Sequence, residues 1–254
     1  MKIAAVQMDL AWEDRNANYA TARRWAGDAA AAGADYIVLP EMFATGFSMD
    51  PCVTAEATDG PTSRFLRDLA RELQVTVSAG FVRRTATGKG VNTALTVGPD
   101  GQVLARYAKT HLIGILGESD AHEAGDGPVA FPVQDLQCSG FICYDLRFPE
   151  LFRLVADKVQ LMTVMASWPN TRQAHWDTLL RARAIENQCF VLGVNRVGSG
   201  GGLDFDGGSV IIDPLGEVIS QLAPREEGIV MAEVCAGDVT AIRTRFPFLA
   251  DRRF

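Results

Sequence analysis

The chain has 254 residues, of which 48% are hydrophobic, and its 24 Lys and Arg against 31 Asp and Glu give a formal net charge of −7. This composition suits a globular protein with a sizeable core, and it argues against a nucleic-acid partner, which would need a basic face. The five cysteines are odd in number and show no CxxC or paired Cys/His spacing, so neither a disulfide framework nor a zinc site is predicted.

The first half of the chain alternates strand and helix signals, which is typical of an α/β fold. Alternating or continuous apolar runs predict the strands, and an Ala-rich stretch closed by Gly33 predicts the first helix. In chain order we expect a strand at 2–8, a helix at 16–32, a strand at 35–39, a loop at 40–60, a helix at about 62–73, and strands at 75–82, 92–97 and 103–107.

The second half begins with a polar, irregular segment at 109–127, and a loop of that length inside a compact domain is usually functional. We then expect a strand at 137–142, a helix from Pro149, a strand at 160–166, an amphipathic helix at 173–188, strands at 189–197, 209–212, 217–220 and 228–234 around a Gly-rich turn at 198–202, and a last helix to Phe246 capped by Asp238. The buried stripe of the amphipathic helix is predicted to hold Trp176, Leu179, Leu180, Ala184 and Ile185.

Two units, 2–41 and 137–168, share an order of strand, helix, strand and Pro-containing exit. They predict a pseudo-symmetric pair of sheets packed face to face, with helices outside. No linker or repeat array interrupts the chain, so a single domain spanning 1–254 is expected. The amino terminus lacks the features of a signal peptide, and no apolar stretch approaches the ~20 residues of a membrane helix, which predicts a cytoplasmic protein with reduced thiols.

Cys143 ends an apolar strand, and the carboxyl end of a strand is where open α/β sheets place their ligands. Taken alone, a free cysteine in such a strand is usually a small core residue. The residues that follow, Tyr144 to Arg147, are too polar to continue the strand, so the thiol is expected where the chain leaves the sheet. There the backbone N–H of Tyr144 is free to point at a developing oxyanion.

Two other strand ends deliver the groups that a thiol nucleophile needs. An unperturbed cysteine has a pKa near ~8.5 and requires activation. Glu41 follows a strand, and its apolar neighbours argue for a partly buried carboxylate that acts as the base. Lys109 follows another strand; alone it reads as a surface lysine, but beside the other two it stabilises thiolate and oxyanion by charge. A Cys–His dyad is the alternative, with His111, His122 or His175.

Three segments, 40–43, 107–112 and 140–150, resemble the signature blocks of the nitrilase superfamily of carbon–nitrogen hydrolases. The resemblance covers essentially the whole chain, because Trp168-Pro169, His175-Trp176 and 183–188 follow in order. Within the superfamily the chain is most similar to the ω-amidase branch, on the run at 40–49.

The resemblance implies a role for each matching residue. Glu41 would be the general base, Lys109 the oxyanion stabiliser and Cys143 the nucleophile, and Glu118 matches a second glutamate that supports the lysine and the substrate. It also implies a four-layer α-β-β-α sandwich that forms a homodimer or a larger homo-oligomer through its helical layers. No cofactor and no metal are expected.

The substrate prediction rests on Arg147, four residues after the nucleophile. Its planar fork suits a bidentate clamp for a substrate carboxylate, although a structural pair with Asp145 or Glu150 is the alternative. The expected substrate is an ω-amide of the 2-oxoglutaramate or 2-oxosuccinamate type, hydrolysed to acid and ammonia through a Cys thioester. Open alternatives are a nitrile, an aliphatic amide, an N-carbamoyl amine, a deaminated-glutathione-type amide, or a non-catalytic binding protein. The apolar wall of the pocket is predicted to contain Phe43, Phe47, Tyr144 and Trp168.

Overall fold

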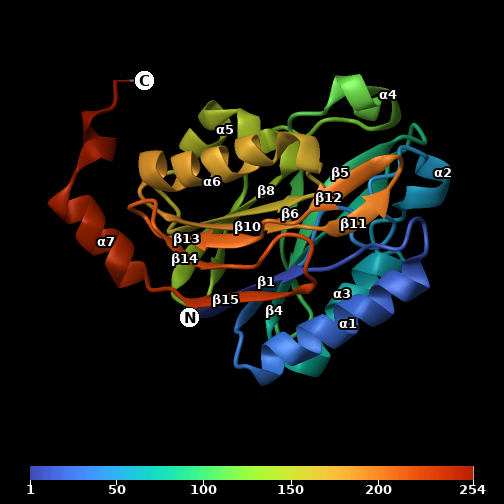
Figure 1. The fold of residues 1–254 in the computed structure, drawn as a ribbon, viewed down its shortest axis with the longest axis horizontal. Coiled ribbons are helices and arrows are strands. Elements are labelled where there is room, and N and C mark those ends of the chain that lie inside the picture. The colour runs from blue at the N-terminus through green and yellow to red at the C-terminus, as the bar shows by residue number, and fades with distance from the viewer. Residues whose placement is uncertain (254) are drawn as a thin grey trace.

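The computed structural model describes residues 1–253, and two β-sheets lie face to face in it with helices on their outer sides (Figure 1). The predicted four-layer α/β sandwich is therefore confirmed. The first sheet has the order β15-β1-β2-β4-β5-β6, with β3 paired to β4. Its strands are β1 (Lys2–Gln7), β2 (Tyr36–Val38), β3 (Ala55–Glu56), β4 (Thr76–Arg84), β5 (Gly90–Val97), β6 (Val103–Ala108) and β15 (Gly228–Glu233).

The second sheet repeats the plan of the first, in the order β14-β13-β10-β9-β8-β7. In each sheet three central strands run parallel, with one antiparallel strand on one side and two on the other. The predicted pseudo-symmetry is thus correct. The strands are β7 (Ala130–Val133), β8 (Leu136–Ile142), β9 (Leu161–Ala166), β10 (Phe190–Asn195), β13 (Val210–Ile212) and β14 (Val218–Gln221).

Crossover helices join the parallel strands and cover the outer faces of the sheets (Figure 1). Helices α1 (Arg15–Ala31) and α3 (Pro61–Leu73) cover the first sheet, and α5 (Pro149–Arg153) and α6 (Gln173–Asn187) cover the second. Such a crossover brings the carboxyl ends of β2, β8 and β9 to one edge of the sandwich, where segments distant in sequence meet. No helix among residues 1–253 is long and apolar enough to cross a membrane.

Several predicted details are wrong. The segment 40–60 is not only loop, since it holds α2 (Pro51–Thr54) and β3. Strand β7 was not predicted, and the Gly-rich turn joins a hairpin of β11 (Val197–Gly200) and β12 (Leu203–Asp206). The last helix, α7 (Ala236–Arg245), is capped by Cys235, whose sulfur accepts the Gly237 N–H, and not by Asp238.

The predicted stripe of α6 is correct for Trp176, Leu180 and Ala184, which are fully buried, but wrong for Ile185, which is 49% exposed. The irregular segment 109–127 contains only single turns, η1 (Gly114–Leu116) and α4 (Glu118–Ala121). The remaining turns are η2 (Cys143–Arg147), η3 (Asn170–Arg172) and η4 (Phe248–Asp251).

Candidate active site

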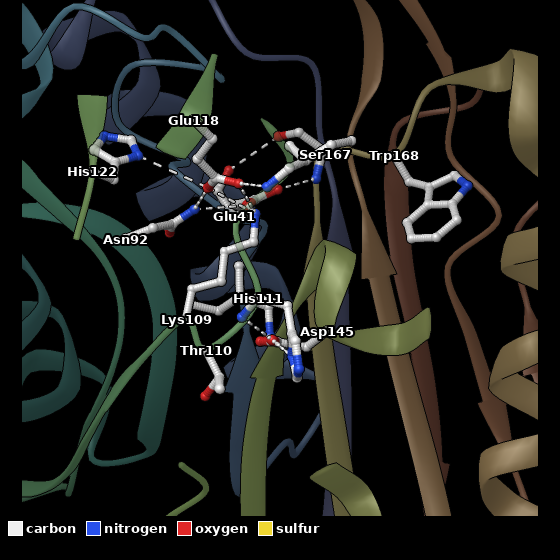
Figure 2. A network of polar contacts seen from close by, with 12 residues as sticks. Glu41, Asn92, Lys109, Thr110, His111, Glu118, His122, Asp145, Ser167 and Trp168 are labelled. Carbon is white, nitrogen blue, oxygen red and sulfur yellow. Dashed lines mark hydrogen bonds and ion pairs between the residues drawn. The ribbon is translucent and has the colours of Figure 1, made fainter. Parts of the chain in front are cut away.

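Three charged side chains meet in the interior at the carboxyl edge of the sandwich (Figure 2). Glu41 follows β2, Lys109 follows β6 and Glu118 begins α4, and all three are fully buried. The Lys109 ammonium donates to Glu41 Oε1 at 2.9 Å and to Glu118 Oε1 and Oε2 at 2.8 and 2.9 Å. These contacts match the three N–H groups of a lysine, so the ammonium is held on every side.

The backbone at Glu41 crosses closely over β4. The next residue, Met42, has a φ of 47°, which turns the chain sharply after the strand. A Cβ at Gly80 would lie 2.7 Å from the Glu41 Cα, so only glycine admits this approach. The Gly80 N–H also donates to the Pro40 carbonyl at 3.2 Å, and the Phe43 N–H to the Gly80 carbonyl at 3.1 Å. Glu41 is therefore fixed by its backbone as well as by its side chain.

Cys143 is the first residue of the turn η2, directly after β8. Its φ of 45° lies in the left-handed region, which is unfavourable for a residue with a side chain and is often found at functional sites. The residue is 8% exposed and lines a narrow cavity together with Tyr144, Arg147, Ser167 and Trp168. The structure thus places the thiol where the sequence predicted, at the exit of a strand and facing a pocket.

Asp145 fastens the cysteine turn to the segment that carries Lys109. Its Oδ1 accepts the backbone N–H of His111 at 2.9 Å and lies 3.0 Å from the His111 Nδ1. Its Oδ2 accepts the Ile142 N–H at 3.1 Å and the Tyr107 hydroxyl at 2.7 Å. One buried carboxylate therefore sets the relative position of the two strand ends.

The surroundings of the Cys143 thiol favour its protonated form. Burial raises the pKa of Cys143 well above its ordinary value, and the nearby Glu41 carboxylate raises it further, while the Lys109 ammonium acts in the opposite direction. Burial lowers the pKa of Lys109, but Glu41 and Glu118 outweigh it, so that this pKa is raised. Burial on its own would raise the pKa of Glu118, but the Lys109 ammonium outweighs burial, so the pKa of Glu118 is lowered.

The three histidines have partners other than the thiol. His111 stacks on Phe148 with ring centroids 3.7 Å apart, and His122 Nδ1 lies 3.8 Å from Glu118 Oε1. The His175 Nδ1 lies 3.3 and 3.2 Å from the two terminal nitrogens of Arg147. Burial has the largest effect on the pKa of Cys143, and the charged groups that also act on it are Glu41, Lys109 and Glu118, not a histidine. This arrangement favours Glu41 over the Cys–His dyad.

Arg147 stacks on the pocket wall with its charge unpaired. Its guanidinium lies 4.7 Å from the Trp168 ring centroid, and within residues 1–253 it forms no ion pair. The alternative pair with Asp145 or Glu150 is therefore wrong. Arg172, which sequence reasoning did not consider, lines the same cavity.

Three of the four aromatic residues predicted for the pocket wall line the cavity. Phe47, Tyr144 and Trp168 line the cavity, and the Phe47 ring centroid lies 5.3 Å from the Lys109 ammonium. Phe43 is wrong, because it packs in the core between the first sheet and its helices, against Tyr19.

The sequence prediction missed two groups that hold Glu41. The Asn92 amide, on β5, donates to Glu41 Oε1 at 2.8 Å and to Glu118 Oε1 at 3.1 Å (Figure 2). The backbone N–H of Ser167, after β9, donates to Glu41 Oε2 at 2.8 Å. Asparagine is depleted in strands, so an Asn inside an apolar strand was a usable signal. Ser167 also donates its hydroxyl to the Glu41 carbonyl at 3.3 Å, and the sequence reveals neither of its two contacts.

The chain is similar to known proteins in sequence and in structure. A family model described as carbon-nitrogen hydrolase matches residues 2–244. A 2-oxoglutaramate amidase of Bacillus subtilis is 37% identical over 222 residues, covering 87% of this chain and 85% of the relative. Omega-amidase YafV of Yersinia enterocolitica is 36% identical over 252 residues, 99% of this chain and 96% of its own. The crystal structure of XC1258 from Xanthomonas campestris, a CN-hydrolase superfamily protein, superposes with a TM-score of 0.94 at 33% identity and covers 100% and 97% of the two chains.

Proposed function

The chain belongs to the carbon–nitrogen hydrolase family, and from this premise we propose that it hydrolyses the terminal amide of a small ω-amide dicarboxylate to the acid and ammonia. The observation that carries the proposal is the buried Lys109 held between Glu41 and Glu118 beside the Cys143 thiol. A thiol that lines the pocket, with a base and a fixed positive charge buried close to it, supplies the parts that acyl transfer requires.

The first half of the reaction forms a thioester. Glu41 takes the proton of Cys143 while the sulfur attacks the amide carbonyl carbon. The Lys109 ammonium and the backbone N–H of Tyr144 stabilise the tetrahedral oxyanion. Glu41 then returns the proton to the amide nitrogen, the C–N bond breaks, and ammonia leaves. The second half repeats these steps with water, which Glu41 deprotonates and which releases the acid from the sulfur.

Charge conservation inside the site explains why a buried carboxylate suits this task. Before attack the cluster of Glu41, Lys109 and Glu118 carries −1 and the thiol is neutral. After attack Glu41 is neutral, the oxyanion carries −1, and the total is unchanged. A neutral Glu41 also holds Lys109 less tightly, which frees one ammonium N–H for the oxyanion. The reaction therefore moves a negative charge within the cavity without adding one to a low-dielectric interior.

The cavity chemistry supports an oxo-acid amide as substrate. Two guanidinium groups, Arg147 and Arg172, line it, and no Asp or Glu does so among the described residues. Arginine binds a carboxylate through two parallel hydrogen bonds. The α-ammonium group of glutamine or asparagine finds no partner there and meets two positive charges, whereas a 2-oxo group accepts hydrogen bonds. We therefore place 2-oxoglutaramate and 2-oxosuccinamate before their amino-acid counterparts.

Ammonia release from a panel of amides tests this function. The panel contains 2-oxoglutaramate, 2-oxosuccinamate, glutamine, asparagine, an N-carbamoyl amine and a simple nitrile. We expect the two oxo-acid amides to have the highest kcat/KM. Turnover confined to the carbamoyl amine or the nitrile would place the chain in another branch of the family.

The carboxylate clamp has its own test in Arg147→Lys. The variant keeps the positive charge but loses the planar guanidinium group, which can form two parallel hydrogen bonds with a carboxylate. KM for the acidic amides should therefore rise by roughly 10-fold or more, with a smaller effect on a neutral amide. Arg181→Lys, on the solvent side of α6, is the matched control. Equal effects on acidic and neutral amides would rule out the clamp.

We also propose that the chain forms a homodimer through the helical layer around α6. Exposed apolar side chains gather there: Ile185 on α6 and, beyond it, Leu215, Val218 and Ile219. The Ile185 side chain lies against Gly216, which brings the turn before β14 to the helix. An apolar face of this kind marks an interaction surface.

The predicted cytoplasmic location stays a prediction.

A further inference from the structure

The Asn92 side chain is a neutral amide placed between two carboxylates. It is fully buried on β5, and its backbone carbonyl accepts the Lys109 N–H at 2.8 Å. Its Nδ2 donates one N–H to Glu41 Oε1 and the other to Glu118 Oε1. Asn92 therefore fixes the backbone and both anionic partners of Lys109 at once.

The two oxygens of Glu41 are not equivalent in this arrangement. A carboxylate oxygen has two lone-pair sites. Oε1 fills both, with the Lys109 ammonium at 2.9 Å and the Asn92 amide at 2.8 Å. Among residues 1–253, Oε2 accepts a hydrogen bond from the Ser167 N–H alone, at 2.8 Å, which leaves one of its two lone-pair sites open to the thiol.

We propose that Glu41 Oε2 is the atom that takes the thiol proton, and that Asn92 is a positioning residue that keeps Oε1 closed to it. In this step the S–H bond of Cys143 breaks, an O–H bond forms on Oε2, and the sulfur electron pair attacks the carbonyl carbon. The same oxygen later gives the proton to the leaving nitrogen. The inference rests on the proposed function, since it names the atom that performs its proton transfers.

An amide is the side chain that meets both demands of this position. It supplies two N–H donors, one for each carboxylate, and so holds two like charges close together without a second cation. A lysine or arginine there would stabilise the ionised carboxylates further and make Glu41 a weaker base. The titratable groups that face Glu41 are Lys109, Glu118 and Cys143, and His122 lies behind Glu118.

The experiment compares Asn92→Ala and Asn92→Ser with the wild type in kcat, KM and the pH profile of kcat/KM for 2-oxoglutaramate. For Asn92→Ala we expect kcat to fall roughly 10- to 100-fold with KM nearly unchanged, the range for loss of one hydrogen bond to a charged group. The acid limb of the profile, which is the fall of kcat/KM at low pH, should move to higher pH. The reason is that the Glu41 carboxylate binds a proton more readily once it has lost the Asn92 donor. Asn92→Ser, which can donate to one carboxylate only, should recover part of both effects.

Asn18→Ala is the matched control, since the buried Asn18 amide also donates to two oxygens, the carbonyls of Ala11 and Ala44. It should lose stability without moving the acid limb. If Asn92→Ala keeps the wild-type kcat, or loses activity with an unmoved acid limb as Asn18→Ala does, the positioning role is overturned.

A second readout separates this inference from the proposed function. The rate at which 2-chloroacetamide alkylates Cys143, followed by peptide mass mapping against pH, depends on removal of the thiol proton and on no turnover. Asn92→Ala should slow it and move its acid limb in the same direction. A wild type that releases no ammonia from any amide would end the proposed function, and the alkylation profile would still decide the role of Asn92. An unchanged alkylation profile would overturn that role.

Discussion

At the scale of single residues, the position of the proposed catalytic groups depends on side chains that take no part in the proposed chemistry. Asp145 is the clearest case, because its two oxygens receive donors from both the Lys109 segment and the Cys143 turn. Sequence reasoning considered this residue only as a partner for Arg147. A carboxylate that reaches backwards to Ile142 and across to Tyr107 is visible only once the strands are in register.

Asp145→Asn should therefore be costly although it changes the shape of the side chain little. The amide keeps one acceptor oxygen and points an N–H₂ at groups that are themselves donors, so buried donors lose their partners. We expect a loss of about 3 kcal/mol in the free energy of unfolding, measured by urea denaturation. Asp135→Asn, at an exposed turn, is the control. A variant as stable as this control would show that the Asp145 contacts contribute little.

The lowered pKa of Glu118 predicts that the stability of the folded protein decreases as the pH falls. Its pKa lies below its usual value of 4.5, because the Lys109 ammonium outweighs the effect of burial. The stabilisation from its ionised form is complete above the usual value and is lost as the pH falls from there through the lowered pKa. The stability advantage of the wild type over Glu118→Gln should therefore shrink between pH 5 and about 2. An advantage that is constant over this interval would contradict the pairing with Lys109.

At the scale of elements, the exit of β2 depends on a glycine in the neighbouring strand. In Gly80→Ala the new Cβ would meet the Glu41 backbone at 2.7 Å, and neither backbone segment can move aside without breaking its hydrogen bonds. We expect about 3 kcal/mol lower stability, and a fall in ammonia release because Glu41 is displaced.

Gly27→Ala is the matched control for this substitution. Gly27 lies inside α1 with nothing within 4 Å of the added methyl group, so alanine should stabilise the helix by about 0.5–1 kcal/mol and leave activity unchanged. Thermal unfolding checks whether Gly80→Ala is less stable and Gly27→Ala more stable than the wild type, and ammonia release checks the activity of both variants. Equal behaviour of the two would show that no close approach exists at β4.

The same scale shows which elements the sequence could predict. The parallel strands and their crossover helices lie in segments with an apolar run or an apolar period, and they were predicted to within a few residues. Elements without such a period were missed: β3 has two residues and β7 has four, and neither stands out from loop. The cap of α7 was misplaced by three residues because a cysteine sulfur replaces the expected carboxylate.

At the scale of the whole molecule, the site lies where the two sheets meet, and each half contributes part of it. Glu41 leaves β2 of the first sheet, and Ser167 leaves β9, the equivalent strand of the second. The sequence could predict that Glu41, Lys109 and Cys143 each follow a strand. It could not show that Asn92 and the Ser167 N–H complete the shell around Glu41. The Asn92 contact depends on the strand order within the first sheet, and the Ser167 contact depends on the packing of one sheet on the other.

The proposed homodimer makes a prediction at this scale. Ile185→Asp places a charge in the apolar face around α6, and it should shift the sedimentation coefficient from dimer to monomer at micromolar concentration. Leu104→Asp, on β6 of the other sheet, should leave the assembly unchanged. A wild type that sediments as a monomer would exclude the dimer, and a larger species would indicate a further contact.

The central claim is that Cys143 is the nucleophile of an amide hydrolase, and its most direct test is ammonia release from 2-oxoglutaramate by Cys143→Ala measured beside Cys138→Ala. Both cysteines are free and buried near the same strand, but only Cys143 lines the pocket. We predict that Cys143→Ala folds and releases no ammonia above background, whereas Cys138→Ala is less stable and still active. Turnover by Cys143→Ala comparable to the wild type would contradict the account.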